Sequence, residues 1–83
     1  MEILYFAWVR ERIGMGSESL SPPDGVKTVA ALLDWLATRS AGHAAALADR
    51  SAIRIAVDQD FVGMYASIAE PCEVAIFPPV TGG

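Results

Sequence analysis

The residues with the clearest chemical potential lie in one segment, "FPPVTGG" at positions 77–83. After Phe77 it consists of Pro78, Pro79, Val80, Thr81, Gly82 and Gly83. The prolines have no backbone N–H, so strand pairing stops there and the backbone is held extended. The side chains of Val80 and Thr81 can contact a partner protein, whereas the glycines have no Cβ and fit a slot too narrow for other residues. The pattern predicts an arm, residues 78–83, that carries the carboxylate of Gly83 into the active site of another protein.

A free carboxylate is a poor acyl donor, so this chemistry requires activation of Gly83, most simply as an acyl-adenylate made from ATP. A sulfur nucleophile would convert the activated carbonyl to a thiocarboxylate, and an amine would convert it to an isopeptide-linked tag. The residues alone leave both outcomes open. The simplest alternative is a frayed chain end without function, and the stiff proline lead-out argues against it.

The chain has one cysteine and one histidine, which excludes an internal disulfide and an ordinary self-contained zinc site. Cys72 has no lysine or second histidine near it in the sequence to favour a thiolate, so we expect a small space-filling residue. His43 lies in an alanine-rich segment, and we expect it to be solvated or at a helix end. Neither residue is predicted to be catalytic.

Other polar patterns also favour structural roles. "DQD" at 58–60 lacks the glycine and distal glutamate of a calcium loop and is expected to form a hairpin turn. The glycines at 14 and 16 lack the spacing and the lysine of a phosphate-binding loop, and "WVRER" at 8–12 is expected to be a solvated turn. The chain therefore lacks a catalytic constellation of its own, and we do not expect an independent enzyme.

The elements that must position the arm follow from the hydrophobic pattern. β-forming or alternating residues predict strands at 2–7, 17–20, 52–58, 61–63 and 72–77. A short helical turn is expected near 8–14, a main helix from Thr28 as N-cap to no further than Gly42, and a short helical piece at 43–49. The main helix has an apolar stripe at helical spacing, formed by Val29, Leu32, Leu33 and Leu36.

A hairpin, a crossover helix and three further strands predict an α+β fold of the β-grasp (ubiquitin-like) type, a mixed sheet with one main helix packed on one face. We expect one domain, residues 1–77, followed by the flexible arm 78–83. The 83 residues are 53% hydrophobic with a net charge of −4, so a compact core is expected and nucleic acid or an anionic membrane is not an expected partner. No apolar run reaches the ~20 residues that span a bilayer, and the start lacks a basic leader, so we expect a cytoplasmic protein.

The chain resembles the small, sulfur-carrying subunit of molybdopterin synthase, the MoaD family, over nearly its whole length. The strongest match is "FPPVTGG" directly after "EVAIF", and "YFAWVRERIG" at 5–14 is similar to the family's first strand with Phe-Ala and Arg-Glu before a glycine. The resemblance implies a ubiquitin-like fold and an adenylating partner of the ubiquitin-activating type that uses ATP. It also implies a thiocarboxylate on Gly83 and no bound cofactor or metal.

The same resemblance implies that the arm, once it carries the thiocarboxylate, enters the large synthase subunit and that sulfur passes from Gly83 to a pterin precursor. It also implies that the synthase is a heterotetramer. The chain departs from the family at Asp58, where asparagine is common, and in the turn "AEPCE", where Asp-Gly is usual. A bare di-glycine is shared with the thiamine-pathway sulfur carrier and with ubiquitin-like protein modifiers, which remain alternatives.

Three residues are candidates for the partner interface: Phe77, Phe6 and Arg10. Phe77 adjoins the arm and is expected on the sheet face away from the main helix, where it forms an apolar patch with Phe6. The alternative is that both aromatic side chains belong to the core.

Overall fold

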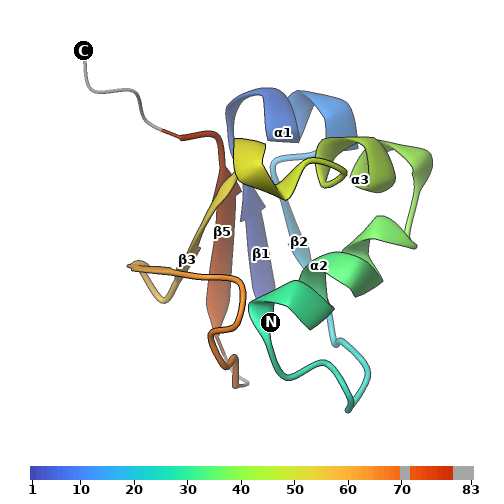
Figure 1. Ribbon diagram of the computed structural model, residues 1–83. Helices are drawn as coiled ribbons and strands as arrows, with labels where there is room; N and C mark the ends of the chain where they lie inside the picture. Colours follow the sequence, from blue (N-terminus) through green and yellow to red (C-terminus); the bar gives the residue numbers. More distant parts are fainter. Residues whose placement is uncertain (70–71, 80–83) are drawn as a thin grey trace.

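The computed structural model describes residues 1–69 and 72–79, and its elements follow the predicted order (Figure 1). The strands are β1 (Glu2–Tyr5), β2 (Ser17–Ser19), β3 (Arg54–Val57), β4 (Asp60–Val62) and β5 (Glu73–Phe77). The helices are α1 (Ala7–Ile13), α2 (Val29–Ala37) and α3 (Ala41–Ala46), with a 3-10 turn η1 (Arg50–Ala52) before β3.

The strands form one mixed sheet in the order β2-β1-β5-β3-β4. β5 runs parallel to β1 and antiparallel to β3, so the last strand of the chain lies in the middle of the sheet. Figure 1 shows α1, α2 and α3 on one side of this sheet. The arrangement confirms the predicted α+β fold, and no helix of the described residues covers the other face of the sheet.

The core lies between the sheet and the helices. Alternate residues of the central strands point into it, and Ile3, Tyr5, Val74 and Ile76 are almost completely buried. They pack with the predicted helical stripe of Val29, Leu32, Leu33 and Leu36, all of which are buried. The main helix therefore attaches to the sheet by the face that the spacing predicted.

Helix α2 begins as predicted, because the Thr28 side chain accepts a hydrogen bond from the N–H of Ala31 at 3.2 Å. It ends at Ala37, and Ser40 then caps the next helix by accepting from the N–H of His43 at 3.0 Å. Helix α3 consequently starts at Ala41, earlier than the predicted 43–49 segment.

The first strand is shorter than predicted. It ends at Tyr5, and Phe6 becomes the N-cap of α1, a helix of 7 residues rather than a single turn. Gly14 ends α1 with φ 94°, a left-handed conformation that glycine adopts without strain, and its N–H donates to the Arg10 carbonyl. The "DQD" segment forms the predicted turn, since Asp58 and Gln59 both have positive φ and Val57 pairs with Asp60.

Candidate functional site

The arm leaves the sheet from its central strand. β5 ends at Phe77, as predicted, Pro78 is half-buried and Pro79 is exposed. Figure 1 shows this exit at the end of the sheet where α1 begins. The remaining predicted arm residues, Val80, Thr81, Gly82 and Gly83, lie outside the described residues.

An apolar groove adjoins the exit of the arm. The Phe77 ring lies 5.7 Å from the Phe61 ring, centre to centre, and Phe61 on the edge strand β4 is 81% exposed. The groove has a volume of about 330 Å³ and is lined by Arg54, Ile55, Phe61, Val62, Phe77 and Pro79. Phe77 is half-buried and Ile55 is buried, so packing holds these two apolar residues of the groove in place next to the arm.

Phe6 lies on the neighbouring chain segment at the same end of the sheet. Its N–H donates to the Ile76 carbonyl at 3.1 Å, and its side chain is 47% exposed. The Arg10 guanidinium lies against Gly16 on the surface of α1. Phe6 is therefore outside the buried core, and the role of Phe6, Phe77 and Arg10 as a partner interface stays a prediction.

The uncovered face of the sheet is apolar in the middle and acidic at the end away from the arm. The register aligns Leu4, Ala75, Ala56 and Phe61 across four strands. One step further from the arm, Glu2 lies opposite Glu73, whose N–H donates to the Asp58 carboxylate at 2.9 Å. The face thus has an apolar centre, an acidic far end and Arg54 near the arm.

Of the two alternatives predicted for His43, the solvated one was wrong, whereas its place at a helix end is confirmed, because His43 lies in the short helix α3. Its side chain is nearly buried, and Nε2 lies 2.6 Å from Oε2 of Glu18 on β2. The same oxygen accepts a hydrogen bond from the Tyr5 hydroxyl at 2.6 Å, and Nδ1 of His43 lies 2.7 Å from Oγ of Ser40. This contact was hard to predict, because Glu18 lies 25 residues away from His43 along the chain.

This cluster of Glu18, His43, Tyr5 and Ser40 is structural. Burial raises the pKa of Glu18, but hydrogen bonds from Tyr5 and His43 and the nearby charge of Arg39 outweigh burial, so this pKa lies below its usual value. Burial, and then the Glu18 carboxylate, raises the pKa of Tyr5 far above its ordinary value, so Tyr5 remains a donor. Because Ser40 is also the cap of α3, the cluster fastens that helix to the sheet.

We expect Glu18→Gln to lower the free energy of unfolding by about 1.5–3 kcal/mol at neutral pH, because a charged acceptor of hydrogen bonds is lost. The folded-state pKa of Glu18 is depressed, so its contribution is present above the unfolded-state pKa and disappears as the pH falls through the folded-state value. Urea unfolding at pH 7 and at pH 3 should therefore show a gap between wild type and variant that narrows in acid. A gap of constant size would contradict this assignment.

Cys72 is buried in the core, as predicted for a space-filling residue. Within residues 1–69 and 72–79, no cluster of three or more His, Cys, Asp or Glu side chains could hold a metal ion. No helix in that part of the chain has the length and apolar character needed to cross a membrane. The predicted turn "AEPCE" includes Glu70 and Pro71, which lie outside the described residues.

Comparisons with known proteins agree with this geometry. The ThiS family profile matches residues 3–83. The chain is 39% identical to the molybdopterin synthase sulfur carrier subunit of Homo sapiens, over 100% of this chain and 93% of the human one. It is 37% identical to the protein of the same name in Escherichia coli K12, over 100% of this chain and 99% of the other. The crystal structure of small archaeal modifier protein 1 from H. volcanii superimposes with a TM-score of 0.73 and 28% identity, covering 96% of this chain and 97% of that one.

Proposed function

This chain belongs to the ThiS family, and from that premise we propose that it is the sulfur-carrier subunit of a molybdopterin synthase. The observation that carries the proposal is the full-length similarity to sulfur carrier subunits of that synthase from human and bacterial sources. The lead-out from the central strand supports it, because β5 ends at Phe77 and the next two residues are the half-buried Pro78 and the exposed Pro79.

In the proposed cycle, a ubiquitin-activating-like enzyme uses ATP to adenylate the Gly83 carboxylate. A sulfur nucleophile then displaces AMP, and the product is a thiocarboxylate on Gly83. The arm that carries the thiocarboxylate enters the large synthase subunit, where its sulfur forms a bond to a carbon of the pterin precursor. Water then hydrolyses the resulting thioester, which leaves the sulfur on the precursor and restores the carboxylate of Gly83. Two sulfur atoms make one dithiolene, so a spent carrier must exchange for a charged one.

The chain's own residues supply position rather than catalysis in this proposal. β5 is held in position by pairing with β1 on one side and β3 on the other. Pro78 and Pro79, directly after β5, restrict the backbone at their own positions. The large subunit supplies the catalytic side chains within a heterotetramer in the cytoplasm. The carrier itself requires no bound cofactor or metal.

Two other roles remain to be separated from this one. A thiamine-pathway sulfur carrier is one alternative, since such carriers share the terminal di-glycine, and the similarity to small archaeal modifier protein 1 favours a protein tag as the second candidate. We expect the gene to restore molybdenum-cofactor synthesis in a strain lacking its own sulfur carrier subunit, but not thiamine synthesis in a strain lacking the thiamine carrier. Rescue of thiamine synthesis alone, or conjugates of higher mass without rescue, would overturn the proposal.

Phe77→Ala is expected to weaken binding to the large synthase subunit by about tenfold or more, because the ring is half-buried beside the arm and its apolar area is available to a partner. The melting temperature should fall only slightly. Calorimetric titration and thermal unfolding of the same samples measure both effects. A large loss of melting temperature with unchanged affinity would assign Phe77 to the core instead.

A further inference from the structure

The groove at the base of the arm has a single charged wall, Arg54, among the residues that line it. Pro79, the last described residue before the glycines, is another of its walls. A protein that binds the chain at Pro79 therefore also lies next to the groove. The residues that line the groove therefore indicate which side chains the partner presents there.

The apolar walls of the groove suit an apolar side chain. Phe61 is almost fully exposed on an edge strand, and it is held against Phe77 in a tilted ring contact. Single exposed apolar residues are ordinary on protein surfaces, but here two aromatic rings, Ile55, Val62 and Pro79 line one hollow. A partner that fills this hollow removes a continuous apolar surface from water.

The guanidinium of Arg54 is held in place beside this hollow. Its Nη1 donates to the carbonyl oxygens of Ile53 at 2.8 Å and Ser51 at 3.1 Å, which leaves other N–H donors of the same group available. Arg39 and Arg50 each form an ion pair with a carboxylate, whereas Arg54 forms none within residues 1–69 and 72–79. A positioned guanidinium of this kind favours a carboxylate, which it can bind with two parallel hydrogen bonds.

We propose that Arg54 binds a carboxylate of the large synthase subunit, next to an apolar side chain of that subunit seated between Phe61 and Phe77. This inference rests on the proposed function, since the relatives' names imply a synthase partner for the arm. The charges at the two ends of the uncovered sheet face also favour one orientation of the partner. Arg54 marks the arm end of the uncovered face, and Glu2, Glu73 and Asp58 mark the opposite end, so a partner docked the other way round would face charges of the wrong sign.

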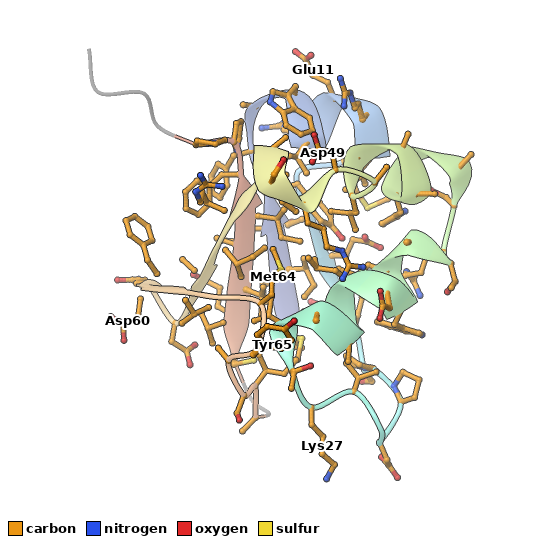
Figure 2. All side chains as sticks on the ribbon, viewed as in Figure 1. Glu11, Lys27, Asp49, Asp60, Met64 and Tyr65 are labelled. Atoms are coloured by element: carbon orange, nitrogen blue, oxygen red, sulfur yellow. The ribbon has the colours of Figure 1, made fainter. Side chains whose placement is uncertain are left out.

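The test is calorimetric titration of the large subunit with the full-length carrier at two salt concentrations. We expect Arg54→Gln to weaken binding about tenfold and Arg54→Glu to weaken it further, with less salt dependence than wild type. Lys27→Glu is the matched control, because it changes the charge by the same amount as Arg54→Glu, on an exposed side chain remote from the groove (Figure 2). Its affinity should stay within about twofold of wild type, and thermal unfolding checks that every variant is folded.

Equal affinity of folded Arg54→Glu and wild type would overturn the inference while leaving the proposed function intact. The same holds if Arg54→Glu slows thiocarboxylate formation by the adenylating enzyme but binds the large subunit normally, since the groove would then serve the other partner. Failure of the wild-type carrier to bind the large subunit would overturn both the inference and the proposed function.

Discussion

A single alanine appended after Gly83 is expected to abolish sulfur transfer while the melting temperature stays at the wild-type value. The extra residue moves the carboxylate by about 3.5 Å and adds a Cβ to the end of a segment that has none. Because a misplacement of about 1 Å can cost about a hundredfold in rate, adenylation of the extended chain should fall below detection. Cofactor production in cells lacking their own sulfur carrier subunit measures the effect.

The matched control carries a protease site directly after Gly83, so that one cleavage restores the native end. Sulfur transfer should be absent before cleavage and should return to the wild-type rate afterwards. Normal cofactor production by the uncleaved chain, with no trimming seen by mass spectrometry, would contradict the proposed role of Gly83.

A second large change is expected from Gly42→Ala, this time in the stability of the fold. Gly42 lies in α3 against the end of α1, and a Cβ added there would stand 2.4 Å from the carbonyl oxygen of Arg12 and 3.3 Å from Cα of Ile13. Backbone cannot yield as a flexible side chain can, so α3 must move away from α1. We expect a loss of about 1–3 kcal/mol in the free energy of unfolding, although alanine is the better helix former by about 1 kcal/mol.

Urea unfolding measures this loss, and Gly25→Ala is its control, because a Cβ at Gly25 meets nothing within 4 Å. The control should unfold within about 0.5 kcal/mol of wild type. A Gly42→Ala protein as stable as the control would show that α3 can move away from α1 at no cost. That result would contradict the view that the Glu18 cluster holds α3 in place on the sheet.

The elements with strong periodicity were predictable from the sequence. The apolar stripe from Val29 to Leu36 lies on the buried face of α2, and the alternation in "AIRIAV" places Ile53 and Ile55 in the core. Hydrophobic spacing determines such elements locally, so no knowledge of distant residues is needed. The order of strands and helix was sufficient to predict the β-grasp arrangement.

The errors concern residues whose environment depends on distant parts of the chain. Phe6 reads as a strand residue, but the chain turns at that point and the helix α1 begins. His43 reads as a surface residue in an alanine-rich segment, but the fold places it beside Glu18 of an edge strand. Local composition carries no information on such a polar partner, which only the packing of α3 against the sheet supplies.

The candidate site was predicted in part. The lead-out of Pro78 and Pro79 follows from "FPP" alone, and Phe77 was expected beside it. Phe61 and Arg54 were not singled out, because their position next to Phe77 depends on how β3 pairs with both β4 and β5. A short strand such as "DFV" has too few residues for its exposed face to be assigned before its partner strand is known.

The central claim is that the carboxylate of Gly83 becomes a thiocarboxylate, and the mass of the intact protein tests it most directly. The purified chain would be incubated with the adenylating enzyme, ATP and a sulfur donor, with the E. coli sulfur carrier subunit as a parallel sample. We predict a mass increase equal to the exchange of one oxygen for one sulfur, located by fragmentation at Gly83. An unchanged mass, while the parallel sample gains sulfur with its own activating enzyme, would contradict the account.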